Sequence, residues 1–153
     1  MIKIGLLDFG IRDNKKNSGL QSLYDVVDYA VRADELGFNR FWMAEKYNFD
    51  YYAGWSNPEV LVPVIAGMTE QIRVGMAGIL LPFHSPFRVS LNFKLLNNLF
   101  SNRIDLGLAK GLVHEKIGEM LNPQIHEASF FSIYEKKVEE LINRIKYLNL
   151  DVL

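Results

Sequence analysis

Polar residues and glycines follow four short apolar segments of this sequence, and their types could support chemistry. They form the pairs or triplets 8–10, 45–46, 81–82 and 110–111, which include two carboxylates and two amines. Carboxylates and amines exchange protons or bind charged ligands when burial or neighbouring charges alter their pKa. Ligands of parallel α/β proteins bind at the carboxyl ends of the strands. We therefore expect any site to lie where these residues gather.

The elements that must position these residues alternate between apolar runs and helical periodicities. Strands are predicted at 2–9, 40–45, 72–81 and 103–109, and helices at 20–36, 56–69, 85–100, 114–121 and 134–148. Gly37 is the expected stop of the first helix, 56–59 has the spacing of a capping box, and Ser85 is the expected cap of the third helix. Successive strand–helix units predict parallel strands and an α/β class, either an open sheet or part of a barrel.

Composition restricts the classes of partner. The 153 residues are 49% hydrophobic and 23% charged, as expected for one folded domain. The net charge of −1, with scattered lysines and arginines, predicts no nucleic-acid partner and no membrane surface. The absence of cysteine excludes disulfides and thiolate sites, so redox chemistry would need a cofactor. Asp8 interrupts the first apolar run, which is too short for a signal core or a membrane span, and a cytoplasmic location is expected.

Four segments in sequence order resemble the bacterial luciferase-like flavin-dependent monooxygenase family. They are 30–48, which includes A-D-E-L-G-F-N-R-F-W-M-A-E, 56–60, 72–86, and 103–111, which reads R-I-D-L-G-L-A-K-G. The resemblance implies a parallel (β/α) barrel of the TIM type. The chain would hold about four of its eight units, so that residues 1–153 form a single half-barrel domain.

The resemblance also implies a cofactor and its contacts. Reduced flavin mononucleotide (FMN), or a deazaflavin in its place, would react with oxygen and a small organic substrate, and a separate flavin reductase would supply the reduced flavin. The implied cofactor-binding residues are Glu45, Met76, Ala77, Gly78 and Lys110. In the family the segment matching 76–78 is bulged, packs against the flavin ring and often contains a cis peptide bond that does not involve proline.

Lys46 and Tyr47 occupy the positions where the family usually has two histidines, so a histidine acid or base is not carried over from those positions. Lys46 is the candidate catalytic residue, since a lysine at a buried strand end can act with a lowered pKa. The alternative is an exposed lysine without a catalytic role. Glu45 is either a cofactor-facing carboxylate or a structural one bonded to nearby backbone. For His84 a turn or capping role is favoured over catalysis.

Other residues give weaker signals. No metal site is expected, because His114 and His126 lack the spacing of metal ligands. Glycines 75, 78, 107 and 111 do not form a dinucleotide fingerprint and are expected to relieve crowding in the barrel. The aromatic residues of 47–55 could line a substrate pocket or cover a barrel end or a subunit contact.

A half barrel leaves the outer edges of its first and fourth strands unpaired, and something must cover them. One hypothesis is an enzyme completed as a homo-oligomer or by a partner chain that carries the other half. A second is a non-catalytic flavin-binding or accessory subunit. A third is a truncated product of a longer monooxygenase, without activity of its own.

Overall fold

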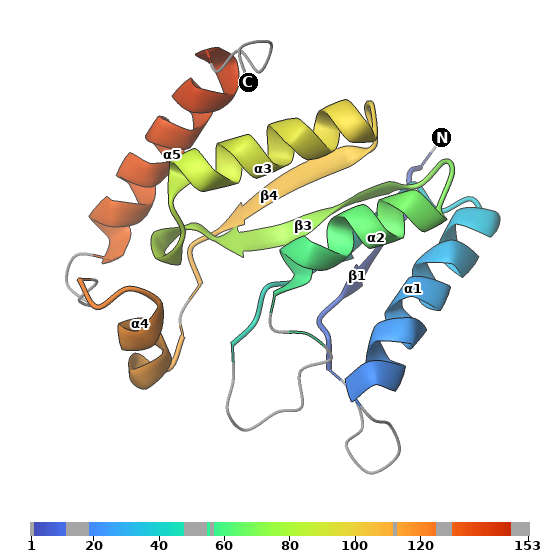
Figure 1. The fold of residues 1–153 in the computed structure, drawn as a ribbon, viewed down its shortest axis with the longest axis horizontal. Coiled ribbons are helices and arrows are strands. Elements are labelled where there is room, and N and C mark those ends of the chain that lie inside the picture. The colour runs from blue at the N-terminus through green and yellow to red at the C-terminus, as the bar shows by residue number, and fades with distance from the viewer. Residues whose placement is uncertain are drawn as a thin grey trace.

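A computed structural model describes residues 2–11, 19–47, 55, 57–111, 113–124 and 130–147. Strands and helices alternate along the chain as predicted (Figure 1). The strands are β1 (Gly5–Asp8), β2 (Arg40–Met43), β3 (Arg73–Leu80) and β4 (Ile104–Ala109). The helices are α1 (Gly19–Glu35), α2 (Leu61–Met68), α3 (Pro86–Leu99), α4 (Glu115–Leu121) and α5 (Phe130–Tyr147), with short 3₁₀ helices η1 (Pro58–Val60) and η2 (Leu81–Phe83).

The four strands form one sheet in the order β1-β2-β3-β4, and every neighbouring pair is parallel. This confirms the α/β class and the parallel strand–helix units. The sheet does not close into a barrel, because β1 and β4 each pair with one strand only among the described residues. The strands are one to four residues shorter than predicted, since the apolar runs continue beyond the ladder hydrogen bonds.

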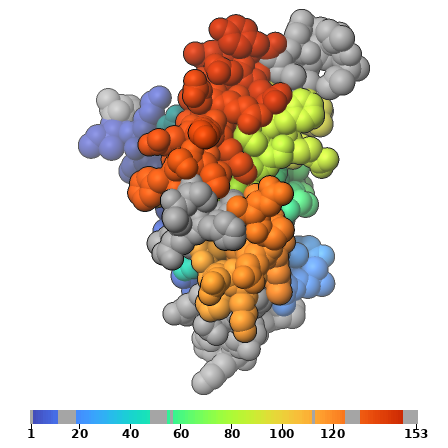
Figure 2. All heavy atoms as spheres, turned by 90° about the vertical axis from the view of Figure 1, so that its left-hand side faces the viewer, coloured from blue at the N-terminus to red at the C-terminus, as the bar shows by residue number. Residues whose placement is uncertain are grey.

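One face of the sheet carries the hydrophobic core. Phe41, Met43, Val74 and Met76 point to this face and are almost completely buried. Helices α1, α2, α3 and α5 contribute the other side of the core, and their buried residues are Val26, Ala30, Ala33, Val62, Ile65, Ala66, Val89, Phe93, Leu96 and Leu141. Helix α5 packs beside α3, with α4 below it in Figure 2. The described helices are not long and apolar enough to cross a membrane.

The opposite face of the sheet, here called the open face, is formed by the alternate residues of the same strands. Leu7, Trp42, Gly75 and Asp105 lie in register across it. Leu7 is well exposed, and Trp42 and Asp105 are partly exposed. In parallel α/β proteins both faces of the sheet are normally covered. The open face is therefore the face that would line the interior of a completed barrel.

Two of the three predicted helix boundaries are confirmed. Gly37 has a φ of +78°, and the Phe38 N–H donates to the Ala33 carbonyl at 3.0 Å, which ends α1 as a glycine stop does. Ser85 caps α3 and accepts a hydrogen bond from the Arg88 N–H. The predicted capping box at 56–59 is not tested, because Ser56 lies outside the described residues. Asn57 is the N-cap of η1 without a capping side-chain bond, and Glu59 accepts from the Asn92 amide of α3 at 2.6 Å.

Strands β3 and β4 approach each other closely where glycines face each other. A Cβ added to Gly78 would lie 2.8 Å from the backbone of Gly107, and one added to Gly75 would overlap the Asp105 backbone. This confirms that these glycines relieve crowding. The register shifts between Met76 and Ile79, so β3 is bulged in the segment where the family resemblance implies a bulge.

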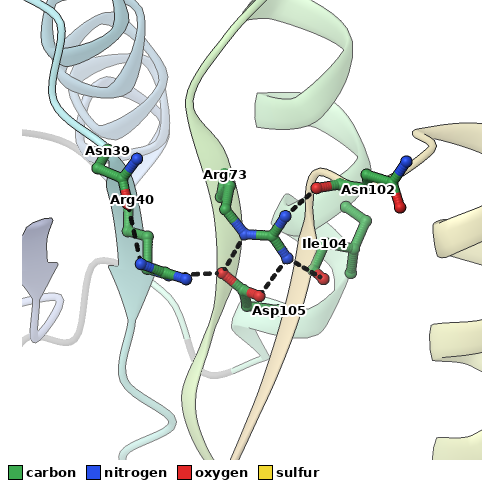
Figure 3. A network of polar contacts seen from close by, with 6 residues as sticks. All are labelled: Asn39, Arg40, Arg73, Asn102, Ile104 and Asp105. Atoms are coloured by element: carbon green, nitrogen blue, oxygen red, sulfur yellow. Dashed lines mark hydrogen bonds and ion pairs between the residues drawn. The ribbon is translucent and has the colours of Figure 1, made fainter. Parts of the chain in front are cut away.

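Three charged residues join the strands near their amino ends, and we call them the amino-edge cluster: Arg40, Arg73 and Asp105 (Figure 3). The Asp105 carboxylate accepts from Arg40 Nε at 2.9 Å and from Arg73 Nε at 2.8 Å, and it also pairs with Arg73 Nη2. Burial raises the pKa of Asp105, but the hydrogen bonds and charges of the two arginines outweigh it and hold that pKa below its ordinary value. The cluster therefore carries fixed charges across β2, β3 and β4.

Candidate functional site

Three titratable side chains meet beyond the carboxyl ends of β2 and β3, and we call them the carboxyl-edge cluster: Glu45, Tyr47 and His84. Glu45 Oε1 lies 2.6 Å from the Tyr47 hydroxyl and 2.6 Å from His84 Nε2. Its other oxygen, Oε2, accepts from the Leu80 N–H at 2.7 Å. Glu45 therefore ties the end of β2 to the last residue of β3 and to the turn that follows.

The Glu45 carboxylate is the most deeply buried charged group of this cluster, with a side chain that is 3% exposed. Burial alone raises the pKa of Glu45. The hydrogen bond and charge of His84 and the bonds from Tyr47 and Leu80 outweigh burial and lower that pKa below its ordinary value. Glu45 is thus ionised near neutral pH, and it acts as an acceptor only.

Tyr47 is held in its neutral form by the same arrangement. Burial, the hydrogen bond to Glu45 and the negative charges of Glu45 and Glu59 all raise the pKa of the Tyr47 hydroxyl. The hydroxyl therefore stays protonated and donates a hydrogen bond to the carboxylate. Tyr47 contributes a neutral donor to the cluster and no charge.

The turn that carries His84 is fixed from another element. The Lys137 amine of α5 donates to the Pro82 carbonyl at 2.6 Å and to the His84 carbonyl at 2.7 Å. The His84 N–H closes the turn on the Leu81 carbonyl at 3.1 Å. Burial lowers the pKa of Lys137, which still finds two acceptors for its ammonium. Helix α5 therefore holds the backbone of His84 in place.

The two candidate lysines lie apart from this cluster's hydrogen bonds. Lys46 directly follows Glu45 and is exposed at the sheet edge. Lys110 follows β4, and its amine lies 3.2 Å from the ring centroid of Phe131 on α5, a cation–π contact. Their positions at the carboxyl ends of β2 and β4 agree with the predicted placement, while their proposed contacts with a cofactor or substrate stay predictions.

The segment 76–78 of β3 divides between the two faces of the sheet. The Met76 side chain is 1% exposed and lies in the core, so that only its backbone could contact a ligand on the open face. Ala77 is half-buried, and the Ala77–Gly78 peptide bond is cis, as the family resemblance implies for this segment. Binding of a cofactor by these residues stays a prediction.

Small residues occupy the open face beyond the amino-edge cluster. Ala77, Gly107 and Ala109, here called the small-residue patch, are all partly exposed. Ala109 pairs with Leu80, whose N–H binds Glu45, so the patch adjoins the carboxyl-edge cluster. These residues project little beyond the backbone, so the open face is flat here. The arginines at the amino end of the same face leave no comparable area.

A separate groove of about 440 Å³ runs along β1 and α1, lined by Leu6, Leu7, Asp8, Phe9, Ile11, Asp25, Tyr29 and Phe41. It lies on the unpaired side of β1 and does not include the carboxyl-edge cluster. Strand edges of this kind are covered by a neighbouring element in stable proteins. The groove therefore indicates where further structure packs, and it is not the candidate site.

Sequence reasoning placed Glu45 correctly and missed its partners. The structural role considered for Glu45 is confirmed, since its carboxylate binds the Leu80 backbone N–H as well as two titratable side chains, while a cofactor-facing role stays a prediction. His84 does lie in a turn, as expected, but its ring binds Glu45. The signal that could have found it is that 81–84 and Glu45 both follow strands at one edge. Phe49, Tyr51, Tyr52 and His126 fall outside the described residues.

Trp55 shows that the aromatic segment covers the end of the sheet at one point. It is buried, packs against Gly10, and donates from Nε1 to the Ala44 carbonyl at 3.2 Å.

Among the described residues no group of His, Asp and Glu side chains has the arrangement of a metal site. Glu45, Tyr47 and His84 supply side chains that can take part in acid–base chemistry at this edge.

Comparisons with known proteins agree with this geometry. A family model described as luciferase-like monooxygenase matches residues 2–119. The N-acetyl-S-alkylcysteine monooxygenase of Bacillus subtilis is 33% identical over 149 residues, which cover 95% of this chain and 43% of that enzyme. A luciferase-like monooxygenase of Escherichia coli is 29% identical over 127 residues, covering 83% of this chain and 37% of that protein. The chain thus spans less than half the length of these relatives.

Solved structures show the same fold. The structure of apo-MsnO8 superposes with a TM-score of 0.84 at 29% identity and covers 95% of this chain and 43% of that chain. The FMN complex of the oxygenating constituent of 3,6-diketocamphane monooxygenase from Pseudomonas putida gives a TM-score of 0.77 at 21% identity, covering 91% of this chain and 38% of that chain. An F420-dependent secondary alcohol dehydrogenase gives a TM-score of 0.71 at 14% identity, and the match covers 92% of this chain and 41% of that chain. At these last two identities the likeness concerns the fold alone.

Proposed function

Because the chain belongs to the luciferase-like monooxygenase family, we propose that it forms the amino-terminal half of a flavin-dependent monooxygenase that uses reduced FMN and oxygen on a small organic substrate. The observation that carries the proposal is the small-residue patch beside the buried carboxyl-edge cluster. A flat ring on the patch would lie next to groups that hold and exchange protons. The FMN complex of a protein with the same fold supports the choice of cofactor.

Several residues would hold the cofactor in this proposal. Ala77 and Gly78 would contact the flavin ring from the bulged part of β3, together with the backbone of Met76. Glu45 would face the ring edge, and Lys110 would lie near the flavin as a cation. Bound reduced flavin supplies the electrons and activates the oxygen, while the protein orients the reactants and excludes water. Lys46 would lie beside Glu45 at the β2 end as an exposed cation.

A deazaflavin is the second candidate cofactor. The deazaflavin F420 binds to a secondary alcohol dehydrogenase whose fold matches 92% of this chain. With that cofactor the reaction would be a hydride transfer without oxygen. The small-residue patch would accept either ring system, since both are flat.

We also propose that a second half barrel covers the open face. It would close on the unpaired edges of β1 and β4 and fill the groove along β1. A second copy of this chain, a partner chain or a further segment of the same polypeptide could supply it. The proposal also includes a cytoplasmic location and a separate flavin reductase that supplies the reduced flavin. The alternative is a non-catalytic accessory subunit.

The test is an anaerobic titration of the protein with reduced FMN and, separately, with reduced F420, followed by admission of air. Binding of reduced FMN with a dissociation constant below about 100 μM, a binding free energy of roughly 5.5 kcal/mol, and oxygen-dependent flavin oxidation that differs from free flavin support the proposal. The variant Ala77→Phe should abolish binding, because it fills the small-residue patch. Leu7→Phe, on the same face in β1, is the matched control. Binding of F420 alone would favour the hydride-transfer alternative, and binding of neither would favour the accessory role.

A further inference from the structure

We propose that His84 is the catalytic residue that exchanges a proton with the bound substrate or cofactor through its Nδ1 atom, and that Glu45 is its positioning residue. This inference rests on the proposed function, because it names the proton-exchanging group of the same site. It departs from the sequence-based assignment of catalysis to Lys46, the residue adjacent to Glu45 in the chain.

The hydrogen bonds of Glu45 fix which nitrogen of His84 carries the proton. An ionised carboxylate has no hydrogen to donate, so each of its partners must be the donor. The Leu80 N–H and the Tyr47 hydroxyl are donors to Glu45, and His84 Nε2 lies at the same 2.6 Å distance as that hydroxyl. Nε2 therefore carries hydrogen, and in the neutral imidazole the lone pair that can accept a proton lies on Nδ1.

The rest of His84 is arranged so that this lone pair is available. Within the described part of the chain, the His84 ring forms its hydrogen bond with Glu45, and it does so through Nε2. The side chain is 24% exposed, so a small ligand or solvent can reach the ring. The backbone carbonyl of His84 is bound by Lys137, which keeps the turn in one position. Position and tautomer are thus both set before a ligand arrives, as efficient proton transfer requires.

His84 is the titratable partner of the Glu45 carboxylate. Glu45 is a buried anion, and neither of its other partners, a neutral hydroxyl and a backbone N–H, supplies a positive charge. Glu59 adds negative charge near Tyr47. The Lys137 ammonium is bonded to the carbonyls of Pro82 and His84 and not to the carboxylate. Among these groups, His84 is therefore the partner of Glu45 whose ring can take up a second proton.

The proton transfer balances without an external oxidant or reductant. An acidic O–H or N–H of the bound ligand breaks, its electron pair stays on the ligand, and the proton forms the Nδ1–H bond. The resulting imidazolium is paired with Glu45, and it later returns the proton to the ligand or to water. Lys46 is exposed and does not share the hydrogen bonds of Glu45 that orient a proton acceptor.

The first arm of the test measures the tautomer in the protein without flavin. Long-range ¹H–¹⁵N correlation spectra of the full chain should show His84 with hydrogen on Nε2 in its neutral form. The variant Glu45→Gln should remove this preference, because the carboxylate that requires hydrogen on Nε2 is gone. A His84 that carries hydrogen on Nδ1 in the unmodified protein overturns the inference, whatever the cofactor is.

The second arm measures reaction. His84→Gln should bind reduced FMN as the unmodified protein does, but slow its reoxidation by about 100-fold or more, the usual contribution of a general acid or base, and it should flatten the pH dependence of the rate. His114→Gln is the matched control, because His114 is exposed and caps α4. An unchanged rate and pH profile in His84→Gln, with a loss in Lys46→Met instead, overturns the inference. If the unmodified protein binds no flavin, the proposed function fails, and the tautomer measurement still decides the state of His84.

Discussion

Two carboxylates join neighbouring strands at opposite edges of the sheet, and they have different kinds of partner. At the amino edge, Asp105 pairs with Arg40 and Arg73, which keep their charge at every accessible pH (Figure 3). At the carboxyl edge, Glu45 binds the titratable ring of His84 and the neutral hydroxyl of Tyr47. In the account proposed above, the same connection between strands gives stability where the partners are permanent cations, and would serve acid–base chemistry where a partner titrates. Parallel barrels generally separate stability and catalysis between these two edges.

Burial strengthens the contrast. The Asp105 side chain is 18% exposed and pairs with two arginines, whereas the Glu45 side chain is 3% exposed and, among the described residues, forms its ion pair with the titratable His84. An anion buried without a fixed cation is costly unless hydrogen bonds and a protonatable neighbour compensate it. The carboxyl edge carries this free-energy cost of a buried anion, as is typical of functional sites.

The largest expected effect comes from removing the charge of the amino-edge carboxylate. Asp105→Asn leaves both arginines without their anion and should lower the free energy of unfolding by about 2–3 kcal/mol, somewhat less than for a fully buried pair because the arginines are partly exposed. Urea denaturation measures this loss. Glu35→Gln, which breaks the exposed pair with Arg32, is the control and should change stability by less than about 0.5 kcal/mol. Equal losses in both variants would contradict a special role of the amino edge.

Lowering the pH should remove the stabilisation that the Asp105 carboxylate provides. The pKa of Asp105 is lowered in the folded protein, so its stabilisation is complete above the unfolded pKa of about 3.9 and is lost as the pH falls below that value. The difference in stability between the unmodified protein and Asp105→Asn should be constant from pH 7 to 5 and should shrink toward pH 3. A difference that changes between pH 7 and 5 would indicate that another group dominates the cluster.

The charge of the carboxyl-edge carboxylate should matter less for stability. Glu45→Gln keeps an acceptor for the Leu80 N–H but weakens the bonds to Tyr47 and His84, and it should cost about 1–2 kcal/mol of unfolding free energy. Its effect on flavin reoxidation should exceed what this loss of stability explains. If Glu45→Gln destabilised the protein more than Asp105→Asn and left the reaction unchanged, the assignment of the two edges would be reversed.

The smallest expected effect concerns the neutral donor. Tyr47→Phe removes one hydrogen bond to Glu45 and should cost about 1 kcal/mol. Since Tyr47 contributes no charge, the pH dependence of flavin reoxidation should keep its shape. A displaced pH profile in Tyr47→Phe would show that the hydroxyl itself takes part in proton transfer.

Local signals in the sequence were sufficient for the elements and for the position of the site. Gly37 and Ser85 mark helix boundaries through backbone geometry and capping, which depend on a few neighbouring residues. The parallel sheet followed from the succession of strands and helices, and it placed Glu45 at the correct edge. The family resemblance added the bulge and the cis peptide bond of 76–78.

Long-range pairings could not be derived in the same way. His84 and Glu45 are 39 residues apart, and the preference of a histidine before a helix for a turn role is a local rule that does not include the strand beside it. Asp105 lies 65 residues from Arg40, and its role depends on the register of three strands. Glu59 likewise has a partner in another helix, Asn92, which lies 33 residues away in the sequence. Such contacts become visible only when the register is known.

The most direct test of the account is to record backbone amide shifts of the ¹⁵N-labelled protein during an anaerobic titration with reduced FMN. The largest changes should fall on Ala77, Gly78, His84 and Lys110 and on the other residues at the carboxyl ends of the strands. The amides of Arg40, Arg73 and Asp105 should change little. Changes centred on the amino-edge cluster, or spread evenly over the sheet, would contradict the claim that the carboxyl edge is the functional one.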